Sequence, residues 1–227
     1  RQEAGKVPPR HNLLRQLTSF VGRERETALI QQYLLEQNIP IVSIIGDGGV
    51  GKTRLAVAIA ESMVTHHRSD RYLDGVWFVS CVGIAPGAAA QEQILVNISA
   101  AIGMEFQGSY SFLHQLADYL SRKALLLILD NFEHLLEHAL LLVEILQQAP
   151  EVQILVTSRQ NLRIQDALRL RLEGLEIPRI AQEEITYRLS DEELQEMLKV
   201  ASVQTFCDRV RKAWSAFTVT NDNGIYI

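Results

Sequence analysis

An eight-residue glycine-rich segment carries the clearest chemical signal in the chain. Residues 46–53 read Gly-Asp-Gly-Gly-Val-Gly-Lys-Thr, which matches the pattern G-x-x-x-x-G-K-[ST]. Glycines at these positions let the backbone wrap closely around a phosphate, so that successive N–H groups point at it. A glycine turn without a ligand is the alternative. The segment predicts binding of a purine nucleoside triphosphate with Mg²⁺, through Gly46, Gly48, Gly49, Val50, Gly51, Lys52, Thr53 and Arg54.

Two of these residues have distinct chemical roles in such a loop. Lys52 is expected to reach the β- and γ-phosphate oxygens, and Thr53 is expected to coordinate the magnesium ion. A second candidate magnesium ligand follows the apolar run 125–129. Asp130 occupies the position of the aspartate that holds magnesium in P-loop nucleoside triphosphatases. Any buried strand that ends in an acidic turn has the same pattern, so the assignment of Asp130 depends on the glycine-rich segment.

The residues that follow Asp130 bear on hydrolysis. In many ATPases of this kind the next residue is the acid that polarises the attacking water, and here that position holds an amide, Asn131. Either hydrolysis is slow, or Glu133 takes the place of the missing acid.

A basic residue closes another apolar strand. Thr157, Ser158 and Arg159 follow the run 153–156, and a basic tip on a central strand points at the γ-phosphate in a doubly wound sheet. Arg159 is therefore a candidate nucleotide sensor. An arginine that pairs with surface acids fits the spacing equally well.

These groups require a sheet that brings them to one edge. Continuous apolar runs predict strands over 41–45, 76–79, 124–129 and 153–156, with 168–172 as a candidate fifth strand. Helical spacing predicts helices over 24–37, 55–64, 94–102, 112–120, 135–146 and 203–213, and a Ser190–Glu193 capping box opens a further one. Apolar strands alternating with helices indicate an α/β fold with a doubly wound parallel sheet that is covered on both faces.

Composition limits the class of protein and its surroundings. The 227 residues are 47% hydrophobic and have a net charge of -5, with 22 basic and 27 acidic residues interleaved. No face is marked as a binder of nucleic-acid backbones, so we expect no direct nucleic-acid binding by this chain. Two separated cysteines indicate a reducing, cytoplasmic setting, and no apolar run is long enough to cross a membrane.

The chain is expected to have three parts. Residues 1–12 are assigned to a linker, 13–178 to a P-loop nucleotide-binding domain, and 179–227 to a partial helical subdomain. We expect the chain to be a fragment of a longer protein with fused effector or sensor domains.

Several blocks together resemble the signal-transduction ATPases with numerous domains (STAND), and among them the NB-ARC-like module of large bacterial transcriptional regulators. The resemblance rests on residues 17–24, 46–55, 74–79, 129–135 and 155–159. It implies a five-stranded sheet in the order 2-3-4-1-5, which would place Arg159 after the strand between the P-loop strand and the Asp130 strand. It also implies that Val21, Gly22 and Arg23 lie against adenine and ribose, so that the ligand is ATP or ADP and not GTP.

The leading hypothesis is a regulatory switch. ADP would hold a closed monomer, and exchange for ATP would favour an open form that self-associates and controls an attached effector, with slow hydrolysis resetting it. One alternative is an AAA+-like motor or loader ATPase that acts on protein or nucleic acid. Another is a scaffold that retains a nucleotide for stability.

Overall fold

The computed structural model describes residues 10–13, 16, 20–65, 71–108, 110–178, 189–224 and 227. The chain divides into two compact units. The first comprises Arg1–Leu14 with Arg25–Glu173, and the second comprises Arg15–Glu24 with Gly174–Ile227.

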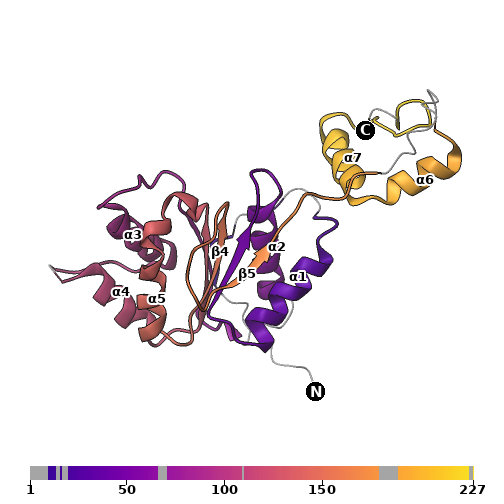
Figure 1. Ribbon diagram of the computed structural model, residues 1–227. Helices are drawn as coiled ribbons and strands as arrows, with labels where there is room; N and C mark the ends of the chain where they lie inside the picture. Colours follow the sequence, from indigo (N-terminus) through magenta and orange to yellow (C-terminus); the bar gives the residue numbers. More distant parts are fainter. Residues whose placement is uncertain are drawn as a thin grey trace, which may run out of the picture. The chain divides into compact units, whose positions relative to one another are not determined.

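A five-stranded parallel sheet forms the centre of the first unit (Figure 1). Its strands lie in the order β2-β3-β4-β1-β5, so the predicted order 2-3-4-1-5 is confirmed. Their bounds are Gly75–Ser80 for β2, Leu125–Asp130 for β3, Gln153–Ser158 for β4, Ile41–Ile45 for β1 and Leu168–Arg171 for β5. Ile45 at the end of β1 pairs with Ser158 at the end of β4, and the end of β3 lies beside β4 through the pair Leu129 and Val156. The segments that follow β1, β3 and β4 therefore start at the same edge of the sheet.

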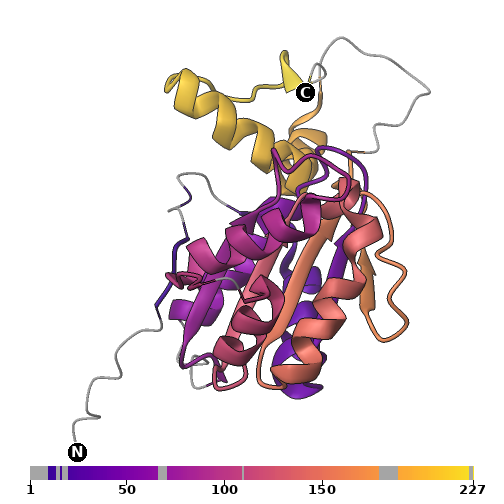
Figure 2. The same cartoon turned by 90° about the vertical axis from the view of Figure 1, so that its left-hand side faces the viewer.

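Helices cover both faces of this sheet, which explains why consecutive residues of the central strands β1, β3 and β4 are buried and most of them are apolar. Helices α3 (Ala90–Ile102), α4 (Phe112–Leu120) and α5 (Leu140–Gln148) lie on one face, and α1 (Glu24–Gln31) and α2 (Lys52–Thr65) lie on the other (Figure 1). Figure 2 shows the first group in front of the strands. Alternate residues of β3, namely Leu125, Leu127 and Leu129, belong to the core beneath α3, α4 and α5.

Helix α2 begins at Lys52, three residues before the predicted start at residue 55. The predicted helix 24–37 is divided into α1 and a π-helical turn, η1 (Gln32–Glu36).

The predicted helix 135–146 is wrong at its start. Two 3₁₀ turns, η3 (Phe132–His134) and η4 (Leu136–His138), precede α5. Asn131 has a left-handed backbone with φ of 61°, which turns the chain after β3. The rings of His134 and His138 hydrogen-bond the carbonyl groups of Cys81 and Gly87 at 3.1 Å each. The segment 132–138 therefore lies alongside the loop that comes after β2.

A short segment of the predicted linker lies along the outer edge of β2. The Val76 N–H donates to the Arg10 carbonyl at 2.9 Å, and the Asn12 side-chain amide bonds both the N–H and the carbonyl of Phe78, at 2.6 and 2.7 Å. Residues 10–12 thus add their hydrogen bonds to the sheet edge. Residues 1–9 of the linker lie outside the described part of the chain.

The second unit contains two helices, α6 (Asp191–Lys199) and α7 (Ala201–Ala213). The predicted capping box is confirmed, because the Glu193 N–H donates to the Ser190 hydroxyl at 3.2 Å and the Ser190 N–H donates to the Glu193 carboxylate at 2.8 Å. A small core of Leu189, Met197, Val203 and Cys207 joins the helices. Residues 179–188 lie outside the described part. In the ranges that are described, no helix has the length and apolar character needed to span a bilayer.

Candidate nucleotide-binding site

The glycine-rich segment forms the turn between β1 and α2, the context that a phosphate-binding loop requires. Gly49 and Gly51 have φ of 84° and 100°, a region that L residues with a side chain rarely adopt. A Cβ built on either would meet no atom within 4 Å. The backbone angle therefore requires glycine there, and there is open space beside the loop.

Lys52 lies at the first position of α2 and is buried to 7% exposure. Its Nζ donates to the carbonyl oxygens of Gly46 and Asp47 at 2.9 and 2.8 Å. An ammonium group has three N–H donors, so these two bonds leave one more for a ligand. The loop carbonyls thus hold the ammonium against the loop, at the N-terminus of α2.

Asp130, the last residue of β3, connects the loop to the neighbouring strands. The Thr53 hydroxyl donates to Asp130 Oδ1 at 2.7 Å, and the Thr157 hydroxyl donates to the same oxygen at 2.5 Å. Asp130 is 5% exposed and Thr157 is fully buried.

Thr157 is a further residue of the site, and its hydrogen bond to Asp130 was not predicted from the sequence. Its hydroxyl donates to Asp130 and accepts the N–H of Asn131 at 3.0 Å. The sequence signal that points to it is the change from the apolar residues Ile154, Leu155 and Val156 to a polar residue before the strand ends. Asn131 contributes its backbone to this cluster, through a turn with φ of 61°.

Glu133 and Arg159 meet at the same edge of the sheet. Arg159 directly follows β4, Glu133 lies in the η3 turn after β3, and their Nε and Oε1 atoms are 3.0 Å apart. The Arg159 side chain is 64% exposed and that of Glu133 is 19% exposed. A Cβ built on Gly48 would lie 3.5 Å from Arg159 Cζ, so the guanidinium group also lies beside the glycine-rich loop. The Arg159 guanidinium therefore lies beside the glycine-rich loop and also pairs with an acid, and its role as a nucleotide sensor stays a prediction.

Comparison with known proteins identifies the family of the chain. The NB-ARC domain family matches residues 23–194, which is most of the chain. The chain belongs to the NB-ARC family. A relative in Mycobacterium tuberculosis (strain H37Rv), Rv0890c, which is named as a candidate HTH-type transcriptional regulator, is 31% identical over 191 residues. That match covers 84% of this chain and 18% of the relative, so the chain spans about a fifth of the relative's length.

Solved structures match the NB-ARC chain at the level of the fold. The Aeropyrum pernix ORC1 protein in complex with DNA has a TM-score of 0.52 at 14% identity, over 92% of this chain and 58% of that one. A STAND protein with a tetratricopeptide repeat sensor from Pyrococcus horikoshii matches with a TM-score of 0.46 at 17% identity, over 90% of this chain and 27% of that one. Together with the strand order, the ORC1 match identifies the fold as that of P-loop NTPases.

The oxygen atoms at this site of the NB-ARC chain fit a magnesium ion. Hydroxyl and carboxylate oxygens are the ligands that Mg²⁺ prefers, and Thr53 and Asp130 bring one of each kind within 2.7 Å. These two residues would hold the ion. When bound, Mg²⁺ would neutralise charge on the phosphate oxygens.

Val21, Gly22 and Arg23 lie in the second unit of this NB-ARC chain. Gly22 has φ of 79°, and a Cβ built on it would come within 2.2 Å of the Ala201 Cβ at the start of α7. Arg23 is buried to 7% exposure. The block is therefore packed within its own unit, and its contact with adenine stays a prediction.

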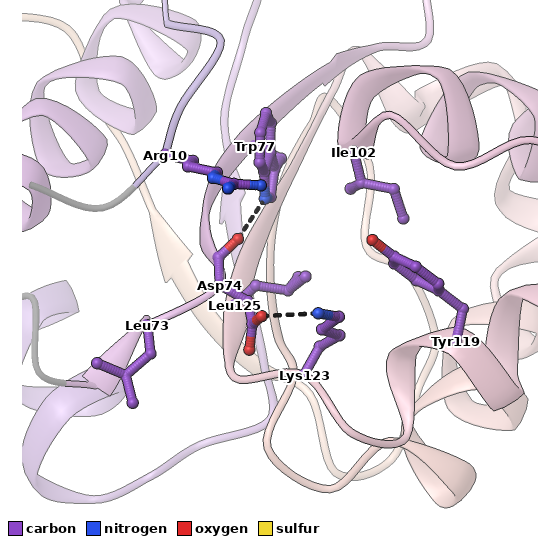
Figure 3. A pocket seen from close by; sticks show the side chains of 8 residues that line it. All are labelled: Arg10, Leu73, Asp74, Trp77, Ile102, Tyr119, Lys123 and Leu125. Atoms are coloured by element: carbon purple, nitrogen blue, oxygen red, sulfur yellow. Dashed lines mark hydrogen bonds and ion pairs between the residues drawn. The ribbon is translucent and has the colours of Figure 1, made fainter.

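A separate pocket of about 330 Å³ lies at the amino-terminal ends of β2 and β3, away from the phosphate-loop edge (Figure 3). Asp74 is one of the residues that line it, and it accepts from Lys123 Nζ at 2.9 Å and from the Ala124 N–H at 2.9 Å. Burial alone would raise the pKa of Asp74, but the Ala124 hydrogen bond and the Lys123 ammonium together lower it below its usual value. In this NB-ARC chain the pair joins the starts of two neighbouring strands.

Proposed function

We propose that this NB-ARC chain is an adenine-nucleotide switch domain that binds ATP or ADP with Mg²⁺ and hydrolyses ATP slowly. The single observation that carries the proposal is the cluster in which Thr53 of the loop and Thr157 of β4 both donate to Asp130 of β3. This cluster joins the phosphate loop to the two strands whose ends carry Asn131, Glu133 and Arg159, so a change at the loop is communicated directly to them.

Slow hydrolysis follows from the residues around Asp130. Asn131 cannot act as a base, and its backbone N–H is bonded to Thr157. Glu133, the nearest alternative acid, is engaged by Arg159. An enzyme with this arrangement keeps ATP bound for long periods. Long retention of ATP fits a regulatory switch better than an ATPase that must turn over quickly to do mechanical work.

The wider role is proposed from the family and the relatives. The mycobacterial relative named for transcriptional regulation is several times longer than this chain, which leaves room for effector and sensor domains. We propose that the ATP state favours self-association and that the attached domains read this change.

The first test is substitution of the loop lysine. Lys52→Ala removes a charge-assisted contact worth roughly 1.5–3 kcal/mol, so ATP and ADP affinity should fall about tenfold to a hundredfold. Isothermal titration calorimetry with Mg²⁺ measures both affinities. Lys199→Ala, which removes a surface lysine paired with Glu196, is the matched control and should bind as the wild type does.

Two outcomes would count against the proposal. Equal affinity of the Lys52→Ala and wild-type proteins would remove the loop from the binding site. Fast steady-state hydrolysis that polynucleotide stimulates further would favour the AAA+-like motor or loader.

A further inference from the structure

Arg159 makes only a partial ion pair with Glu133. The guanidinium Nε lies 3.0 Å from Glu133 Oε1, while Glu133 Oε2 has no hydrogen-bond partner among the described residues, so the pair lacks the bidentate arrangement that gives Arg–carboxylate pairs their strength. The terminal nitrogens of the guanidinium lie toward the phosphate loop, 3.7 and 3.8 Å from a Cβ built on Gly48. One group thus spans the distance between Glu133 and the loop.

Glu133 is left incompletely satisfied in this arrangement. Its Oε2 atom is buried and has no hydrogen-bond partner among the described residues. A buried polar atom without a partner costs free energy and is rare in folded proteins, where it marks strain or a functional constraint. The pair is therefore not explained as a device for stability.

The surroundings of Glu133 also concentrate negative charge. The Asp130 and Glu133 carboxylates, after burial itself, raise the pKa of the nearby Cys81 thiol to about 12. Arg159 is the cation that approaches this group of acids from β4. A triphosphate at the loop would bring a second anionic group within reach of the same guanidinium.

We infer that Arg159 is shared between two anions, Glu133 in the resting protein and the terminal phosphate of bound ATP, and that Glu133 thereby sets the preference between ATP and ADP. The inference rests on the proposed nucleotide-binding function. ADP lacks the third phosphate group, so it leaves Arg159 on Glu133. ATP must compete with Glu133 for Arg159, and Glu133 is a positioning residue that acts through the arginine.

The test measures the affinities of the whole chain for ADP and for a non-hydrolysable ATP analogue. Glu133→Gln keeps the size of the side chain and removes the competing charge, so the analogue should bind about two- to fivefold more tightly. ADP affinity should stay within twofold of the wild type. Glu137→Gln is the matched control, because Glu137 lies on the next turn, accepts from the Gly87 N–H and is not paired with Arg159.

A double-mutant cycle separates this role from a merely structural one. Arg159→Ala should reduce the preference for the ATP analogue, and adding Glu133→Gln to that variant should change the preference no further. Thermal melting confirms that each variant is folded.

Several outcomes would overturn the inference while leaving nucleotide binding intact. One is a Glu133→Gln variant whose ratio of ATP-analogue affinity to ADP affinity equals that of the wild type. Another is weaker binding of the analogue by that variant. A third is a change in this ratio on Glu133→Gln that is the same in the wild-type and Arg159→Ala backgrounds. If the wild-type chain binds neither nucleotide, the proposed function itself fails, so the two failures are distinguishable.

Discussion

At the scale of single residues, the Thr157 hydroxyl links the ends of β3 and β4. It donates to Asp130 and accepts from Asn131, and it is fully buried. Removing it would leave the Asn131 N–H without its acceptor and would take from Asp130 Oδ1 one of its two hydroxyl donors, the other being Thr53.

Thr157→Val should therefore destabilise the chain by about 1–3 kcal/mol, although it keeps the shape of the side chain. Urea denaturation measures the loss. Thr157→Ser keeps the hydroxyl and should lose less stability than the valine variant. Equal stability of the valine variant and the wild type would show that the hydroxyl is not holding Asp130 and Asn131.

The partners of this hydroxyl explain what sequence reasoning missed at the site. The loop residues and Asp130 were predictable because each lies in a motif with fixed spacing. Thr157 and Asp130 are 27 positions apart, and only the pairing of β3 with β4 brings them together. The Glu133–Arg159 pair has the same origin.

At the scale of elements, the strands were the most predictable part of the fold. The runs in β1 to β4 are largely apolar because helices cover both faces of the sheet, and each predicted run lies where a strand lies. In β5, at the edge of the sheet, leucine and arginine alternate. The segment 132–138 was not predictable, because apolar residues such as Phe132 and Leu136 also fit a helical period. Long-range bonds from His134 and His138 decide its path, and such bonds leave no local signal.

The Asp74–Lys123 pair offers a test of how the starts of β2 and β3 are joined. The folded state lowers the Asp74 pKa, so the carboxylate stabilises the fold at pH values above the ordinary value of 3.8. This contribution is lost as the pH falls through the lowered value. The pair is about 30% exposed on each side, which limits its contribution to about 0.5–1 kcal/mol.

Asp74→Asn should therefore be less stable than the wild type at pH 7, and the difference should shrink as the pH falls below 3.8. Urea denaturation across pH 3–7 gives the comparison. Asp118→Asn, an exposed change on α4, serves as the control. A difference that is constant with pH would exclude the carboxylate charge as the cause.

At the scale of the whole molecule, the two units have cores of very different size. Among the described residues, 27 buried hydrophobic residues form the core on one face of the first unit, and four form the core of the second. Each core contains one cysteine, Cys81 in the first and Cys207 in the second. Burial raises the pKa of both thiols, that of Cys81 to about 12.

We expect neither thiol to react with Ellman's reagent at pH 8 in the folded chain. With increasing urea, Cys207 should become reactive before Cys81, because a small core unfolds first. Cys81→Ala and Cys207→Ala variants assign each signal. Nucleotide at 100 times its dissociation constant should add about 2.7 kcal/mol to the free energy of unfolding of the first unit. Labelling of Cys81 should then require a higher urea concentration. Simultaneous labelling of both cysteines would show that the chain unfolds as one unit.

The segment along the edge of β2 also limits how copies of this chain can assemble. An open sheet edge is a template for strand addition by another molecule. Here the Val76 and Phe78 backbone groups are already bonded to Arg10 and Asn12. The β2 edge is therefore protected against intermolecular sheet growth while these residues stay in place, and the proposed self-association would not proceed by strand addition at this edge.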